Sequence, residues 1–153
     1  MHIEDTIRTL NQLIRLCRDC EDFCDTATHR AVGPDLGAVL RHRGEEWGRL
    51  GDELQALVLL LGGNPATSAT LAARARHWSL RARLAVLGPA DATIVAAWQS
   101  VEREALARYL EAIDGYLPER IRRTVSLQAD RVAGRAERIG DLFGEVAMGS
   151  PSH

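Results

Sequence analysis

The regular spacing of apolar residues is the feature that most constrains how this chain can fold. In the first segment, apolar side chains return every three or four positions between Ile3 and Thr28, a spacing that puts them on one face of an α-helix. The same spacing recurs in later segments, and the alternation typical of strands is nearly absent. Breaks rich in Gly or Pro separate the segments: Gly33-Pro34, residues 62–65, Gly88-Pro89 and Leu117-Pro118. The pattern predicts an all-α protein.

We expect four long helices and one shorter one, over residues 3–31, 35–61, 67–87, 90–116 and 118–146. The first two helices and the last two are joined by tight turns, so each pair should form an antiparallel hairpin. Almost thirty residues separate the two hairpins. Two hairpins joined by a long crossover that holds the shorter helix make a ferritin-like four-helix bundle.

Composition narrows the class of protein further. The chain has 153 residues, 46% of them hydrophobic, which suits one domain with its own core. We expect the bundle to occupy residues 1–147 and residues 148–153 to be a disordered tail. The net charge of −2 predicts no nucleic-acid partner. No apolar run reaches the roughly 20 residues of a membrane span, and the polar N-terminus does not resemble a signal peptide.

The odd number of cysteines points to a cytoplasmic protein with reduced thiols, since the chain has three and no export signal. Every one of the 19 basic residues is arginine. Such usage is typical of a GC-rich bacterial genome, so we expect a bacterial protein.

Several polar residues interrupt the apolar stripes near the middle of their helices. They are Glu21, Arg43, Glu102, Gln128 and Arg135, with Glu46 at the edge of its stripe. A buried carboxylate without a partner costs several kcal/mol, so each must be paired, protonated, metal-bound or at a wet opening. The two halves of the chain also echo each other: Glu21 matches Glu102, and Glu46 matches Gln128. This match suggests a duplicated helical hairpin.

Ferritin-like di-iron sites use a Glu from each of two helices and a Glu-x-x-His from each of the other two. Here Arg49 follows Glu46 at the position of the histidine, and Gln128 is followed by Arg131. A guanidinium cannot bind a metal ion, so we do not expect an intact di-iron centre. We favour a buried network of Glu with Arg and Gln. A modified site for one ion, with iron on the central carboxylates, is the alternative; its candidate ligands are Glu21, Glu46, Glu102 and Gln128.

Cys17, Cys20 and Cys24 lie on one face of the first helix, with Glu21 beside them. Three thiolates and a carboxylate could bind a soft ion such as Cu(I) or Zn(II). Buried free cysteines are also common core residues, and we favour that interpretation over the metal site.

Small and aromatic residues suggest where other elements pack. Three tryptophans are expected to be core anchors between the crossover helix and the bundle: Trp47, Trp78 and Trp98. Three glycines crowd one side of the second helix, which would let the crossover helix or a second subunit approach closely: Gly44, Gly48 and Gly51. A homodimer is therefore possible.

Several stretches also share their order of residues with known proteins: residues 9–14 (TLNQLI), 20–23 (CEDF), 53–57 (ELQAL), 61–65 (LGGNP) and 107–109 (ARY). Over about residues 9–143, the chain resembles a bacterial family of four-helix-bundle proteins of unknown function in the ferritin-like superfamily. The resemblance implies a ferritin-like fold without the standard iron ligands and with no assigned reaction. The three cysteines depart from the usual pattern of that family.

The sequence carries none of the common catalytic motifs, such as a phosphate-binding Gly-rich loop, Gly-x-Ser-x-Gly or His-Glu-x-x-His. We therefore expect a non-catalytic bundle that serves as a stress-linked structural or interaction module. The alternative is a metal-binding protein that holds copper or zinc on the cysteines or iron on the central carboxylates.

Overall fold

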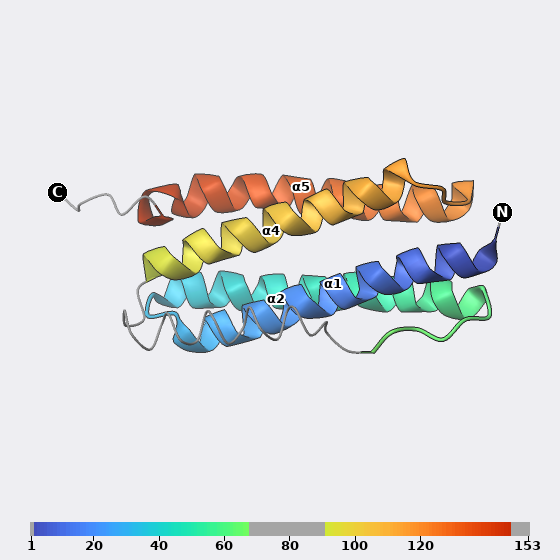
Figure 1. Cartoon of the computed structure of the whole chain (residues 1–153). Coiled ribbons are helices and arrows are strands. Elements are labelled where there is room, and N and C mark those ends of the chain that lie inside the picture. Colours follow the sequence, from blue (N-terminus) through green and yellow to red (C-terminus); the bar gives the residue numbers. More distant parts are fainter. Residues whose placement is uncertain (1, 68–90, 148–153) are drawn as a thin grey trace.

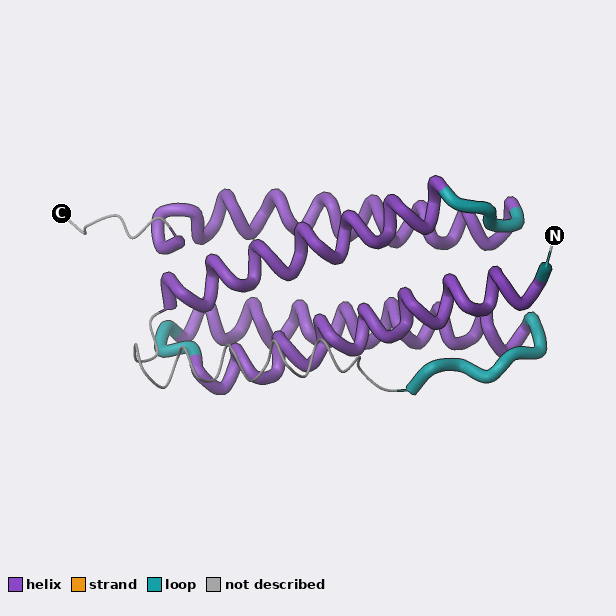
Figure 2. Tube along the Cα trace, viewed as in Figure 1, coloured by secondary structure: helices purple, strands orange, loops and turns teal. Residues whose placement is uncertain are grey.

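The computed structural model describes residues 2–67 and 91–147, and this part of the chain forms four helices and no strand (Figures 1 and 2). The helices are α1 (Ile3–Arg30), α2 (Pro34–Leu60), α4 (Asp91–Asp114) and α5 (Glu119–Ala147). The predicted all-α class is confirmed, and the helix ends lie within two residues of their predicted positions. The predicted helix at 67–87 lies, beyond Thr67, outside the described residues, as do Trp78 and the predicted tail at 148–153.

Local sequence explains where the helices begin and end. Pro34 opens α2, where its fixed φ suits the first turn and its missing N–H is not needed. After α2, Gly62 adopts a φ of +80°, a left-handed conformation that glycine reaches without strain. The C-terminal end of α4 is capped by a residue of α5, because the guanidinium of Arg122 donates to the backbone carbonyls of Ile113 and Gly115.

The helices form two antiparallel hairpins, α1–α2 and α4–α5, which lie one above the other in Figure 1. The Asp91 carboxylate, at the start of α4, accepts hydrogen bonds from the backbone N–H groups of Val32 (2.9 Å) and Gly33 (2.8 Å) in the α1–α2 turn. Consequently α2 and α4 begin at the same end of the bundle. None of the helices in the described part is both long enough and apolar enough to cross a membrane.

The apolar stripes of the four helices meet in one core, and Trp47, Trp98 and Tyr109 are its largest side chains. The glycine side of α2 faces α1. A Cβ added at Gly44 would lie 3.1 Å from the Cβ of Cys24, and one at Gly51 would lie 3.3 Å from that of Cys17. The close approach that the sequence predicts for this side is therefore made by α1, whereas contacts with the crossover helix or a second subunit stay a prediction. The glycines let the two helices of the first hairpin pack closely.

Candidate functional site

A single carboxylate, Glu102 on α4, lies at the centre of the bundle with no solvent exposure. Its Oε1 accepts hydrogen bonds from Arg43 Nε (2.6 Å), Trp47 Nε1 (3.1 Å) and Trp98 Nε1 (3.0 Å). Its Oε2 accepts a bond from Arg43 Nη2 (2.6 Å). The guanidinium and carboxylate thus form a bidentate pair, the strongest arrangement for these two groups. Four donors offset the cost of burying this charge.

Helical spacing brings the four side chains together. Arg43 and Trp47 lie one turn apart on α2, and Trp98 and Glu102 lie one turn apart on α4, so each pair shares one face of its helix. The Arg43 guanidinium also lies 4.8 Å from the centre of the Trp47 ring, within range of a cation–π interaction. Burial alone lowers the pKa of Arg43, but the hydrogen bonds and charge of Glu102 outweigh it and raise that pKa.

A second ion pair joins α2 to α5, between Glu46 and Arg135. Glu46 is mostly buried, and His42 Nε2 lies 3.5 Å from its other oxygen. Burial and the nearby charge of Arg43 lower the pKa of Arg135, while Glu46 opposes them. The Nη1 atoms of Arg43 and Arg135 are buried without a hydrogen-bond partner among the described residues. The carboxylates of Glu46 and Glu102 thus have donors on both oxygens, whereas Arg43 and Arg135 each have one nitrogen without an acceptor in the described part of the chain.

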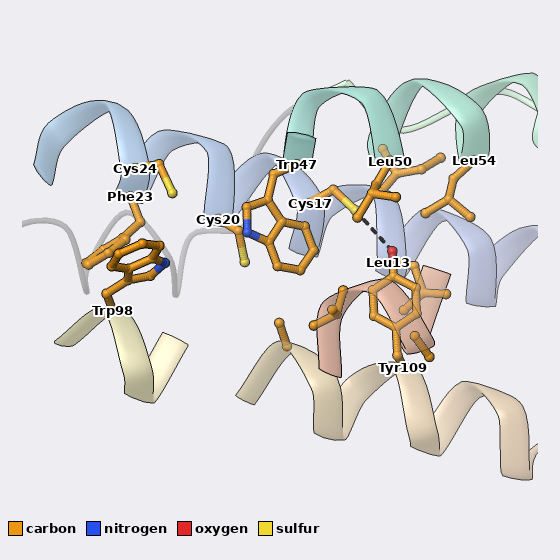
Figure 3. Close-up of a cluster of buried hydrophobic side chains, with 14 of the residues drawn as sticks. Leu13, Cys17, Cys20, Phe23, Cys24, Trp47, Leu50, Leu54, Trp98 and Tyr109 are labelled. Carbon is orange, nitrogen blue, oxygen red and sulfur yellow. Dashed lines mark hydrogen bonds between the residues drawn. The ribbon is translucent and has the colours of Figure 1, made fainter. Parts of the chain in front are cut away.

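A neutral cluster, formed by the side chains of Tyr109, Gln128 and Cys17, lies further along the bundle. Tyr109 donates its hydroxyl proton to Gln128 Oε1 (2.7 Å), and Cys17 Sγ lies 3.4 Å from the same hydroxyl (Figure 3). The Gln128 amide donates to the backbone carbonyl of Leu50 (3.3 Å) and to Glu53 Oε2 (2.9 Å). Gln128, a candidate metal ligand in the sequence, therefore links α4 to α2 by hydrogen bonds from its place on α5.

The three cysteines are free thiols within the core, among the aromatic and leucine side chains drawn in Figure 3. Burial raises the pKa of Cys17 to about 12, although the hydrogen bond with Tyr109 opposes the shift. Burial, followed by the charge of Glu102, also raises the pKa of Cys20 and Cys24. The thiolate is the form that attacks electrophiles and binds metals. All three side chains are therefore protonated near neutral pH, as core residues would be.

Glu21 lies apart from this central network. Its side chain is 40% exposed and pairs with Arg18 (3.2 Å), which also binds Asp52 (2.9 Å). The expectation that Glu21 is buried is wrong. The carboxylate lies at the rim of the α1–α2 contact, where a Cβ at Gly48 would come within 2.6 Å of Oε2. The absence of a side chain at Gly48 gives the carboxylate room to lie there and reach water.

The residues considered as metal ligands are thus spread over three environments. Glu46 and Glu102 lie in the charged cluster, Gln128 and Cys17 in the neutral one, and Glu21 at the surface. In residues 2–67 and 91–147, no three His, Cys, Asp or Glu side chains are arranged to hold a metal ion. Arg49 and Arg131, at the two histidine positions, are exposed.

The tryptophans have a polar role that was not predicted from the sequence. Trp47 and Trp98 are buried, as expected of core anchors, yet both indole N–H groups point to one carboxylate (Figure 3 shows the rings). A signal was present in the sequence. Each tryptophan lies one turn from a polar residue of the same stripe, Arg43 or Glu102, and a buried indole N–H needs an acceptor.

The fold and this network define an all-α four-helix bundle with a buried Arg–Glu pair at its centre. Residues 5–115 match a family described as a domain of unknown function, DUF2383, and the chain belongs to this family. The matched region holds Glu102 and the three residues that donate hydrogen bonds to it, Arg43, Trp47 and Trp98. It ends before Gln128. No curated protein matches the chain.

Proposed function

We propose that this protein is a non-catalytic bundle of ferritin-like topology that serves as a structural or interaction module. The observation that carries the proposal is the bonding of Glu102. Both carboxylate oxygens are held by Arg43 and two indole N–H groups. A metal-binding bundle would use such a central carboxylate as a ligand. In this chain a guanidinium supplies the positive charge.

The course of the helices supports the proposed topology. Both hairpins are antiparallel, and the hydrogen bonds of Asp91 put the start of α4 beside the start of α2. In a ferritin-like bundle, the connection between the hairpins runs the length of the molecule and produces this parallel arrangement of the second helix and the one after the crossover.

The state of the reactive side chains supports a non-catalytic role. Catalytic groups need pKa values matched to their task near the working pH. The pKa of Cys17 is raised to about 12, and that of Tyr109 is raised well above its usual range by burial and by Cys17. Neither group would exchange a proton readily near neutral pH.

Metal analysis of the purified, reduced protein tests the proposal. We expect no stoichiometric copper, zinc or iron, and no shift of the thermal midpoint when each ion is added, because a ligand that binds the native state would raise that midpoint. Stoichiometric copper or zinc that is lost on replacing Cys17, Cys20 and Cys24 by Ala would establish the soft-metal alternative. Iron that is lost in Glu46→Gln would establish the carboxylate alternative.

A matched control separates loss of ligands from loss of fold. Glu45 neighbours Glu46 on α2 but is exposed, so Glu45→Gln removes a carboxylate without touching the cluster. A true carboxylate site would lose iron in Glu46→Gln and retain it in Glu45→Gln. Sedimentation at several protein concentrations tests the possible homodimer, since self-association would appear as a rise in mass with concentration.

A further inference from the structure

The contact surface between the α1–α2 hairpin and the α4–α5 hairpin, which we call the seam, belongs to the common apolar core and also carries a row of polar contacts. Bonds cross it along most of its length: Asp91 to Val32 and Gly33, Glu102 to Arg43 and Trp47, Tyr109 to Cys17, Gln128 to Leu50 and Glu53, and Arg135 to Glu46. Every helix of the described part contributes to this set.

Inside the hairpins the helix backbones approach each other more closely than they do across the seam. In the α1–α2 hairpin, Gly44 and Gly51 bring the helix backbones together, and Gly63 packs against Ile7. In the α4–α5 hairpin, the turn is short and Arg122 fastens it to the last turn of α4. Each hairpin is also a continuous stretch of chain with a small loop, so little entropy is lost in closing it.

Because its helices lie farther apart and part of its contact is polar, the seam should be the weakest interface of the described bundle. A buried ion pair gives little net stability, because desolvation offsets most of the attraction between the charges. A hydrogen bond likewise adds only a small net amount. Proteins open locally where an interface is least stable, and supersecondary units often open as one body.

The second hairpin helps to bury the three thiols, although α2 also approaches Cys17 and Cys24. Cys17 contacts Tyr109 of α4, and Cys20 and Cys24 lie near enough to Glu102 of α4 to feel its charge. All three are at most 1% exposed. We propose that the α4–α5 hairpin separates from the α1–α2 hairpin as a unit, and that this opening uncovers Cys17, Cys20 and Cys24 together. The seam is then a gate on thiol chemistry, independent of the function proposed above.

The reaction of native full-length protein with Ellman's reagent tests the gate. Each exposed thiolate attacks the disulfide of the reagent, forms a mixed disulfide and releases one thionitrobenzoate anion. Three proteins, each retaining one cysteine with the other two replaced by Ala, report each position separately. After correction for the reactivity of the unfolded chain, we expect one common rate, with a weaker dependence on denaturant than global unfolding shows.

Variants of the seam should change that rate selectively. Gln128→Ala removes the bonds to Leu50, Glu53 and Tyr109 and should accelerate all three thiols about tenfold. If this variant does not fold, Asp91→Ala removes two bonds at a less buried end of the seam and should act in the same direction. Arg18→Ala is the matched control: it removes bonds to Glu21, Asp52 and the Gly48 carbonyl within the α1–α2 hairpin and should leave the rates unchanged.

Two results would overturn the proposal. Acceleration by Gln128→Ala and Arg18→Ala in proportion to the global stability that each variant loses would mean that the thiols react only from the unfolded chain. Clearly different rates for Cys17, Cys20 and Cys24 would mean that α1 frays locally.

Discussion

Glu21 and Glu102 match each other in the sequence pattern of the two hairpins, yet their carboxylates lie in opposite environments. Glu102 is fully buried and accepts four hydrogen bonds, whereas the side chain of Glu21 is 40% exposed and pairs with Arg18 on its own helix. Both residues interrupt an apolar stripe. The difference lies in what each one faces across the helix contact: Glu102 faces an arginine and an indole, and Glu21 faces Gly48.

This comparison shows that position on a stripe does not decide the burial of a carboxylate. A buried charge needs a partner and hydrogen bonds to repay its desolvation, and Arg43 provides both for Glu102. Beside Gly48 there is room for the Glu21 carboxylate to turn toward water, where it needs no buried partner.

Breaking the buried pair should have the largest effect. Arg43→Ala leaves the Glu102 carboxylate buried without its cation, and we expect the free energy of unfolding to fall by about 3–5 kcal/mol. Denaturant unfolding at neutral pH measures this change. The control is Arg49→Ala, an exposed arginine on the same helix, which should shift stability by less than about 0.5 kcal/mol. Equal effects of the two substitutions would contradict the central role of the pair.

High pH should destabilise the core through Cys17, the buried thiol that contacts Tyr109. The pKa of Cys17 is raised from 9.0 to about 12 in the folded protein. Above pH 9 the unfolded chain loses this proton and the folded chain keeps it, so stability falls by about 1.4 kcal/mol per pH unit until the folded pKa is reached. Unfolding at pH 8 and pH 10.5 should therefore show a loss about 2 kcal/mol smaller in Cys17→Ala than in the wild type. Identical losses would mean that Cys17 titrates normally.

The neutral cluster should be less costly to break than the charged one. Tyr109→Phe removes the hydroxyl that donates to Gln128 and contacts Cys17. We expect a destabilisation of about 1–2 kcal/mol, because a buried acceptor loses its donor. Tyr116→Phe, at a tyrosine that is 70% exposed, is the matched control and should change stability very little. Thermal unfolding of both variants side by side provides the test, and a loss as large as that of Arg43→Ala would erase the distinction between the clusters.

Replacing Glu21, the exposed carboxylate, should change the free energy of unfolding very little. Glu21→Gln keeps the size of the side chain and removes a charge that water screens, so we expect a change within about 0.5 kcal/mol. Adding salt should shrink even this difference, because screening weakens the pair with Arg18. A loss of several kcal/mol in the denaturant midpoint would show that Glu21 is buried in solution.

Much of the fold follows from local sequence. Apolar spacing and the Gly and Pro breaks predict the four described helices to within two residues at each end, since periodicity and capping act over a few residues. The stripes also identify Glu102, Gln128 and Arg43 as buried polar residues. Periodicity places a residue on a face but does not say which helix covers that face.

The rest depends on that missing information. Gly44, Gly48 and Gly51 lie on one side of α2, as expected, but only the structure shows α1 against them. The exposure of Glu21 depends on the same contact. The bonds from Trp47 and Trp98 to Glu102 join side chains on α2 and α4, so no local pattern specifies them.

Arg43 gives the centre of this bundle a permanent positive charge. A guanidinium does not give up its proton under any condition that leaves a protein folded, and it is part of the covalent chain. A bundle whose central positive charge is a bound metal ion can lose that charge to chelators, to reductants or when iron is scarce. The charge opposite Glu102 is synthesised with the polypeptide and stays with it.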